Sequence, residues 1–136
     1  MSSEKIKSSI LGFILGDALG VPFEFQSRAI LKKHPVTTMV GGGSWDQPIG
    51  TWSDDTSMVL ATMDSLSMGY NLSQLGKNFH HWLYKQKYTP YGVVFDCGNQ
   101  TREGLKRIHK LITTNQTVTP LPPTSDENQN GNGSLM

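Results

Sequence analysis

The stretch Gly50-Thr51-Trp52-Ser53-Asp54-Asp55-Thr56 marks the start of a helix and carries the most distinctive chemistry of the chain. Apolar residues recur behind it at helical spacing, and Gly69 then supplies a left-handed stop. Ser53 precedes this pattern, and its hydroxyl can accept a hydrogen bond from an N–H of the first turn, so it is the predicted N-cap. The predicted buried face of the helix is Met58, Val59, Thr62, Met63 and Leu66.

Three oxygen-bearing side chains at the start of this helix, Ser53, Asp54 and Asp55, form a candidate cation site. Adjacent residues of a first turn diverge by about 100° around the axis, but short side chains can still reach one point beyond the helix end. Two carboxylates and a hydroxyl supply about half of an octahedral shell, which suits Mg²⁺ or Mn²⁺. The alternative is structural, because the helix dipole stabilises acids in a first turn by about 0.3–1 kcal/mol each without any metal.

Helical spacing predicts three further helices. They are expected over residues 4–19, 73–86 and 101–112, with Ser73 as the cap of the second. Residues 26–50 lack such a pattern and are predicted to form a long surface loop. The run Val93-Val94-Phe95 could form a brief strand, but we expect a loop packed against the core. The predicted fold class is therefore all-α.

Length and charge exclude several classes of function. The chain has 136 residues, a formal net charge of +1 and 17% charged residues, which argues against nucleic acid or a membrane surface as a partner. A single cysteine, Cys97, excludes an internal disulfide. We expect that no stretch approaches the roughly 20 apolar residues of a membrane span. We therefore expect a soluble cytoplasmic protein.

The composition changes near Thr113. Residues 113–136 are rich in Pro, Asn and Gly, and such a segment alone buries too little apolar surface to offset its ordering entropy. We expect a helical part over residues 1–112 and a second part over residues 113–136. The second part is either a disordered tail or the beginning of a further element.

A second motif closes the first predicted helix. Gly16-Asp17-Ala18-Leu19-Gly20 is followed by Glu24, which lies among apolar and aromatic neighbours where a carboxylate is costly to bury unless it is paired, protonated or bound to a cation. Together with the stretch around Asp54, this motif resembles the ADP-ribosylglycohydrolase family, including its dinitrogenase reductase-activating type. Two more segments extend the resemblance over nearly the whole chain: Asp96-Cys97-Gly98-Asn99-Gln100-Thr101 is similar to D-x-G-N-x-T, and Gly131-Asn132-Gly133-Ser134-Leu135-Met136 to G-N-G-[SG]-x-M-R.

The resemblance implies a compact orthogonal helical domain and a metal-dependent hydrolase that removes ADP-ribose from a modified protein side chain. Ser53, Asp54 and Asp55 would hold one or both of two Mg²⁺ or Mn²⁺ ions, with Ser53 standing where the family usually has threonine. Glu24 would be the acid/base or water-positioning carboxylate. The substrate would be an ADP-ribosylated protein or ADP-ribose itself.

The resemblance also implies substrate contacts. Asp96 and Asn99 would face the ribose and the departing side chain, although turn and helix-capping roles remain open for both. The loop formed by Gly131, Asn132, Gly133 and Ser134 would offer backbone N–H groups to ribose and phosphate. Trp45 and Trp52 flank the metal motif and are predicted to anchor loops, with stacking on an adenine as the alternative.

One departure from the family pattern limits these expectations. Family members carry a second metal motif, D-x-D-T, in a C-terminal half about as long as this chain, and the present sequence has no such motif. The chain therefore resembles an apparently truncated N-terminal half, which we expect to be catalytically weak or inactive alone. A separate C-terminal half is the expected partner. The alternative is a non-catalytic remnant that binds ADP-ribose or metal.

Overall fold

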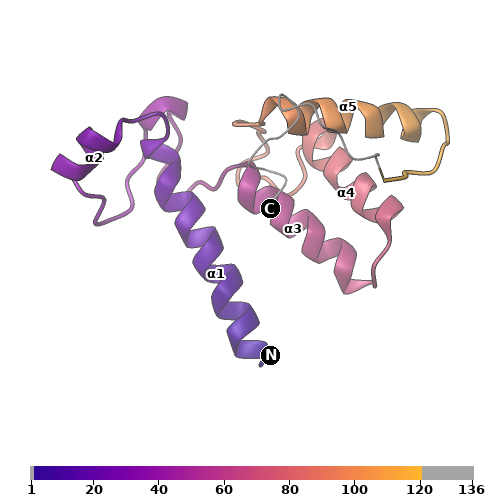
Figure 1. Ribbon diagram of the computed structural model, residues 1–136, viewed down its shortest axis with the longest axis horizontal. Helices are drawn as coiled ribbons and strands as arrows, with labels where there is room; N and C mark the ends of the chain where they lie inside the picture. The colour runs from indigo at the N-terminus through magenta and orange to yellow at the C-terminus, as the bar shows by residue number, and fades with distance from the viewer. Residues whose placement is uncertain (1, 121–136) are drawn as a thin grey trace. The chain divides into compact units, whose positions relative to one another are not determined.

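A computed structural model describes residues 2–120 of the chain. Within this range there are five α-helices, two short 3₁₀ helices and no β-strand (Figure 1). One isolated bridge joins Gly42 to Gln47. The predicted all-α class is confirmed. The chain divides into two units, residues 1–56 and residues 57–136.

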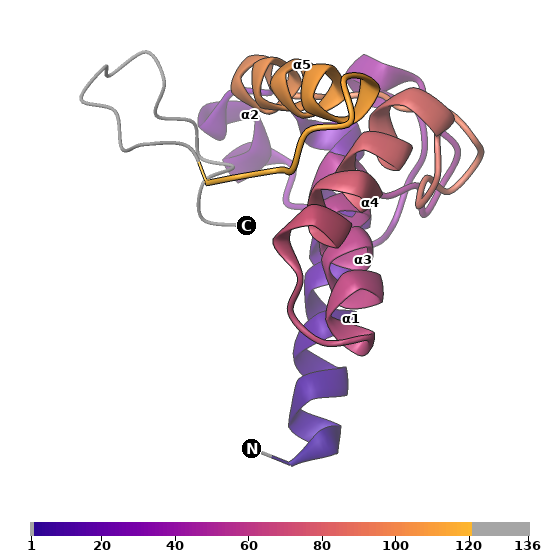
Figure 2. The same cartoon turned by 90° about the vertical axis from the view of Figure 1, so that its right-hand side faces the viewer.

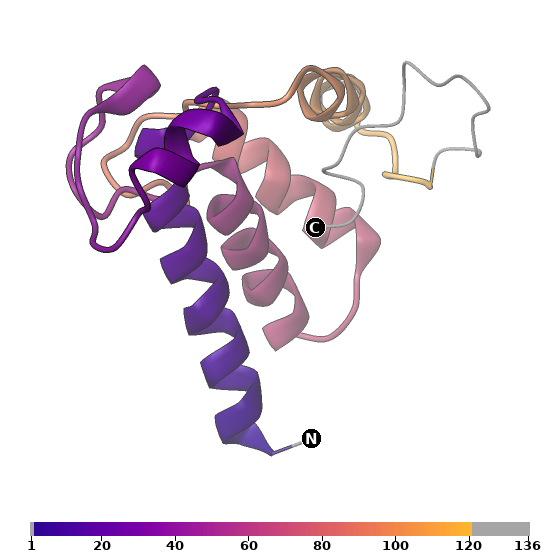
Figure 3. The ribbon, with the colours of Figure 1, turned by 60° about the vertical axis from the view of Figure 1, so that its left-hand side comes forward.

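The first unit is built on the long helix α1 (Ser3–Gly20). The Ser2 hydroxyl accepts a hydrogen bond from the Lys5 N–H and begins the helix. Its C-terminal end continues directly into the 3₁₀ helix η1 (Val21–Phe23), where proline supplies a φ suited to a first turn. The short helices α2 (Arg28–Lys33) and η2 (Gly43–Trp45) follow, and both lie near the C-terminal end of α1 (Figures 1 and 3).

The prediction of an unstructured loop over residues 26–50 is wrong at α2. This helix begins at Ser27, whose side chain accepts a hydrogen bond from the Ile30 N–H at 3.3 Å. Six residues span less than two turns, so no apolar period can be read from them. The capping serine was a local signal for this helix.

Helix α1 is apolar around most of its circumference. The segment Ser3–Phe23 is 21 residues long and contains an 18-residue window with a mean hydropathy of 1.4, so by length and composition alone it also matches a membrane span or a signal sequence. The expectation that no segment reaches such a length is therefore wrong for residues 3–23. The carboxylate of Asp17, however, bonds to the backbone near the start of α3 (Asp54–Ser67), which favours a helix of a folded domain.

The second unit contains most of α3, together with α4 (Leu72–Lys85) and α5 (Asn99–Thr113), and α4 packs against α5 (Figure 2). Trp82 of α4 and Leu105 of α5 are almost completely buried. A Cβ on Gly76 would come within 3.1 Å of the Val118 side chain, so an alanine there would require that side chain to shift by a few tenths of an ångström. The N-cap of α4 lies two residues before the predicted one, because Asn71 and not Ser73 accepts the hydrogen bond from the Gln74 N–H.

The buried face of α3 differs from the predicted one. Met63 and Leu66 are exposed, whereas Ser57, Ala61 and Ser65 are buried. Small residues on this face allow a side chain of α4 to reach the helix backbone. The Asn78 amide donates to the Ala61 carbonyl at 3.0 Å and in turn accepts a bond from Gln74 at 2.9 Å.

Three aromatic rings stack between α4 and α5. The rings of His80 and Tyr84 are 4.6 Å apart, and both also stack on His109. A 2.9 Å hydrogen bond joins Nε2 of His80 to Nδ1 of His109. Burial lowers the pKa of His80, and the nearby His109, His81 and Lys85 lower it further.

Candidate metal and ligand site

The carboxylate of Asp17 caps the first turn of α3. The Ser53 N–H donates to both of its oxygens at 3.1 and 3.0 Å, and the Thr56 N–H donates to Oδ2 at 3.0 Å. The Ser53 hydroxyl accepts a bond from the Asp55 N–H at 3.3 Å, as expected of an N-cap. The start of α3 therefore has acceptors from two places, its own serine and the last turn of α1.

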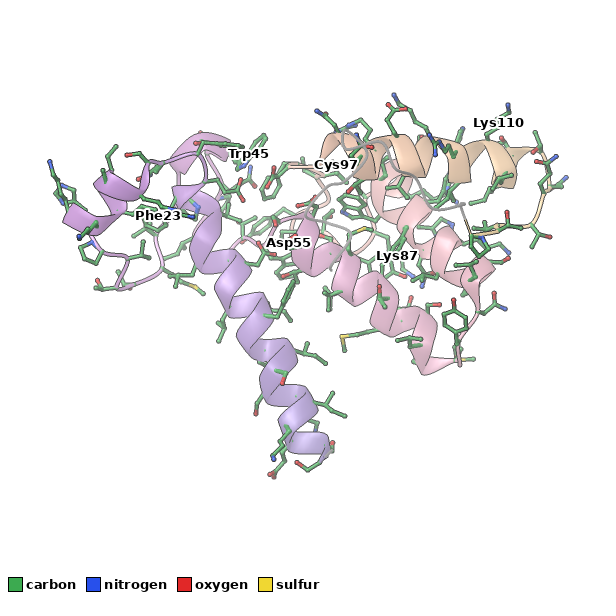
Figure 4. All side chains as sticks on the ribbon, viewed as in Figure 1. Phe23, Trp45, Asp55, Lys87, Cys97 and Lys110 are labelled. Carbon is green, nitrogen blue, oxygen red and sulfur yellow. The ribbon has the colours of Figure 1, made fainter. Side chains whose placement is uncertain are left out.

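An open pocket of about 400 Å³ lies along the same part of α1. It is lined by Gly12, Phe13, Gly16, Asp17, Gly20, Glu24 and Asp55. Two of the acids predicted from the sequence, Glu24 and Asp55, thus share one pocket, with Asp55 in the first turn of α3 (Figure 4). The three glycines recur every fourth residue, so one side of α1 presents only backbone to the pocket.

Glu24 is held by the loop around Trp45. The indole N–H of Trp45 donates to the Glu24 carboxylate, and the Ser44 hydroxyl donates to the Glu24 carbonyl at 3.1 Å. The Trp45 ring also packs edge-on against Phe25, with ring centroids 6.0 Å apart. Trp45 is therefore a loop anchor, and its anchoring point is the candidate catalytic acid.

The three proposed metal ligands differ in exposure. Ser53 and Asp54 are only 3% and 8% exposed, whereas Asp55 is half-buried and reaches the pocket. Over residues 2–120, no three His, Cys, Asp or Glu side chains lie close enough together to form a metal-binding group. A cation here would therefore rely on two carboxylates and the serine hydroxyl. Next to them, the fully buried Thr56 hydroxyl has no hydrogen-bond partner within the described residues.

The residues predicted to contact the substrate lie in later segments of the chain. Asp96 adopts a left-handed backbone conformation with φ +49°, in keeping with the turn role left open for it. Asn99 is the first residue of α5, and Gly98 occupies the N-cap position that Asn99 was considered for. Both belong to the second unit. The predicted substrate loop, Gly131, Asn132, Gly133 and Ser134, lies outside the described residues.

Two residues of this region were not predicted as parts of the site. Asp17 was noticed only as an element of a motif, and Trp45 was predicted to anchor a loop, with stacking on an adenine as the alternative. The available signal for Asp17 was a charged residue within an otherwise apolar helix, which is stable only where its carboxylate finds donors. Nothing local in the sequence indicated that Trp45 reaches Glu24.

Comparison with known proteins identifies the family. The family model for ADP-ribosylglycohydrolase matches residues 2–136. The chain is 35% identical over 111 residues to ADP-ribosylarginine hydrolase Tri1 of Serratia proteamaculans (strain 568), covering 80% of this chain and 30% of the relative. It is 32% identical over 138 residues to ADP-ribosyl-[dinitrogen reductase] glycohydrolase of Rhodospirillum rubrum, covering 98% of this chain and 42% of the relative. The chain thus spans well under half the length of these relatives, and it belongs to the ADP-ribosylglycohydrolase family.

Proposed function

We propose that this chain provides one part of a metal-dependent hydrolase that removes ADP-ribose from arginine side chains of modified proteins. Relatives named for ADP-ribosylarginine and for ADP-ribosylated dinitrogen reductase support this substrate class. The observation that carries the proposal is the shared pocket of Glu24 and Asp55. It brings a candidate general base to the same surface as a candidate metal ligand.

The residues at the start of α3 fit a hard divalent cation. Ser53, Asp54 and Asp55 offer oxygen ligands only, which Mg²⁺ and Mn²⁺ prefer. The orphaned Thr56 hydroxyl supports a further polar occupant here, since a buried hydroxyl without a partner costs about 1–3 kcal/mol. When bound, one or two such ions supply positive charge that orients ribose hydroxyls and lowers the pKa of a coordinated water.

Glu24 performs the proton transfer in this proposal. Its carboxylate accepts a proton from the attacking water as the oxygen bonds to the anomeric carbon of the ribose. The carbon–nitrogen bond to the arginine side chain breaks in the same reaction: the nitrogen keeps the bonding electron pair, and the departing guanidine takes up the proton removed from the water and leaves as guanidinium. Trp45 and Ser44 fix the direction of Glu24 through its carboxylate and its carbonyl, respectively. A base held in one orientation contributes more to the reaction rate than a mobile one, because it needs no further ordering before it reacts.

The substrate contacts proposed for the second unit follow the family resemblance. Asp96 would bind the departing guanidinium, because a carboxylate pairs well with this group. Asn99 would contact the ribose, and residues 131–134 the phosphates. The chain matches 30% and 42% of the length of these two relatives, so it is proposed to supply one part of the active site and to hydrolyse its substrate slowly when assayed alone.

The test combines metal binding, ligand binding and turnover on the same preparation. Calorimetric titration with Mn²⁺ and then ADP-ribose is expected to show Mn²⁺-dependent uptake of ADP-ribose. Incubation with ADP-ribosyl-arginine is expected to release arginine slowly, and Asp55→Asn is expected to weaken Mn²⁺ binding. Asp46→Asn is a matched control, because Asp46 is exposed in the same unit and lies outside the residues that line the pocket.

Each outcome separates the two functions left open by the sequence. Mn²⁺-dependent release of arginine supports the hydrolase. Binding of Mn²⁺ and ADP-ribose with no release at all supports the non-catalytic module. Turnover as fast as that of the longer relatives would overturn the proposal that this chain supplies only one part of the active site, and absence of Mn²⁺ binding would overturn the metal site.

A further inference from the structure

Asp17 makes the longest-range polar contact described within the first unit. Its carboxylate accepts hydrogen bonds from the backbone of residues 36 and 39 positions later in the chain, Ser53 and Thr56. Both of its oxygens take part, and one oxygen accepts two bonds. A carboxylate has about four lone-pair positions, so most of its accepting capacity is directed at the start of α3.

These two N–H groups are the ones that a capping box normally satisfies. In such a box, the N-cap side chain accepts from the third helical residue, and an acid at that third position accepts from the N-cap backbone. Here Ser53 is the N-cap and the third residue is Thr56, which cannot perform the second task because it carries no carboxylate. The carboxylate of Asp17, on α1, accepts hydrogen bonds from both N–H groups. Its negative charge also lies at the positive end of the α3 dipole.

The same contact links the two acids of the pocket. Helix α1 carries Asp17 and continues directly into η1, and Glu24 is the residue that follows η1. Asp54 and Asp55 are the two residues between the backbone positions that Asp17 holds. Fixing Ser53 and Thr56 therefore fixes the direction in which the intervening carboxylates leave the helix.

We infer that Asp17 is a positioning residue: its carboxylate holds the first turn of α3 so that Ser53, Asp54 and Asp55 can bind a divalent cation beside Glu24. The inference rests on the proposed function. Asp17 is not a ligand in this arrangement, because its oxygens already accept three hydrogen bonds from two backbone N–H groups. It acts through the residues it orients, as do the outer partners of many metal ligands, whose loss typically weakens metal affinity about 10–100-fold.

The experiment compares Asp17→Asn with Asp46→Asn in the full chain. Asparagine has nearly the shape of aspartate but replaces one acceptor oxygen by a donor, which faces an N–H that also donates. We expect Asp17→Asn to raise the Mn²⁺ dissociation constant about tenfold or more. Backbone hydrogen exchange, followed by NMR, is expected to be faster at Ser53 and Thr56 than in the unaltered chain. Asp46→Asn should change neither quantity, because Asp46 is exposed and its left-handed conformation, φ +47°, suits asparagine.

Exchange in the unaltered chain provides a measurement that does not depend on a variant folding. Both amides should be protected without Mn²⁺ and more strongly protected with it. Unprotected amides would overturn the inference, and so would a Mn²⁺ affinity that Asp17→Asn leaves unchanged. Weaker Mn²⁺ binding with unchanged exchange at Ser53 and Thr56 would also overturn it, because Asp17 would then be a direct ligand.

Failure of the proposed function gives a different result. An unaltered chain that takes up no Mn²⁺ overturns the metal site and the positioning role together. Equal Mn²⁺ binding by the unaltered chain and by Asp17→Asn overturns the positioning role alone.

Discussion

The indole N–H of Trp45 donates a hydrogen bond to the carboxylate of Glu24, although 21 positions separate the two residues. Trp45→Phe keeps an aromatic ring against Phe25 but removes this donor. The free energy of unfolding is expected to fall by about 1–2 kcal/mol, because hydrogen bonds to charged groups contribute about 1.5–3 kcal/mol and part-burial weakens them. Urea unfolding measures the change.

A double-mutant cycle isolates this bond from other effects of the tryptophan. Trp45→Phe should cost less in a Glu24→Ala background, where the acceptor is already absent, with a coupling energy on the order of 1 kcal/mol. Strictly additive costs would show that the contact contributes nothing to stability. Because Glu24 is the proposed base, the single variant should also lower the rate of arginine release.

Substitution of Gly16 is expected to raise the stability of the chain and to weaken ligand binding. A Cβ at this position would meet nothing within 4 Å, and the residue lies in the interior of α1. Gly16→Ala should therefore stabilise the chain by about 0.5–1 kcal/mol through helix propensity. Its methyl group would enter the pocket and weaken ADP-ribose binding severalfold.

Gly104→Ala is the matched control for this change. Gly104 lies inside α5, and a Cβ there also meets nothing within 4 Å, but it is not among the residues of the pocket. The two variants should raise the urea midpoint similarly, and only Gly16→Ala should affect ADP-ribose titration. Equal ADP-ribose affinity in both would argue against this pocket as the ligand site.

The sequence predicted those features that depend on neighbouring residues. The helices from Ser3, Asp54 and Asn99 follow from apolar spacing and from local capping, and their bounds agree with the prediction within about two residues. Glu24 and Asp55 were both identified as site candidates, and the pocket they share is compatible with that role.

Contacts between distant segments could not be predicted in this way. Asp17 and Ser53 are 36 positions apart, so no periodic pattern links them. The prediction for the buried face of α3 was wrong for a related reason. Apolar residues were assigned to the interior, but the approach of the Asn78 side chain to the Ala61 carbonyl favours small residues. Which face of a helix is buried depends on its partner as well as on its own hydrophobicity.

The buried amide of Asn78 gives a prediction about this contact between α3 and α4. Asn78→Asp replaces the donor that faces the Ala61 carbonyl by an oxygen and introduces a charge at a position that is only 2% exposed. We expect the free energy of unfolding to fall by about 2 kcal/mol or more. Gln74→Ala is the control: it removes the outer bond of the pair and should cost less than about 1 kcal/mol. Similar costs in urea unfolding would mean that the inner bond is unimportant.

The buried His80 makes stability depend on pH. Its pKa in the folded chain is lowered from the usual 6.5, mainly by burial and then by the charge of His109, so the unfolded chain binds more protons just below pH 6.5. The free energy of unfolding should therefore decrease as the pH falls through this window.

His80→Phe retains ring stacking with Tyr84 but cannot be protonated, and its urea midpoint should change less between about pH 7.5 and about pH 5.5. His34→Gln, at an exposed position, should keep the full pH dependence. An equally steep dependence in His80→Phe would assign the effect to other groups, of which His81, whose pKa is also lowered by burial, is the first to examine.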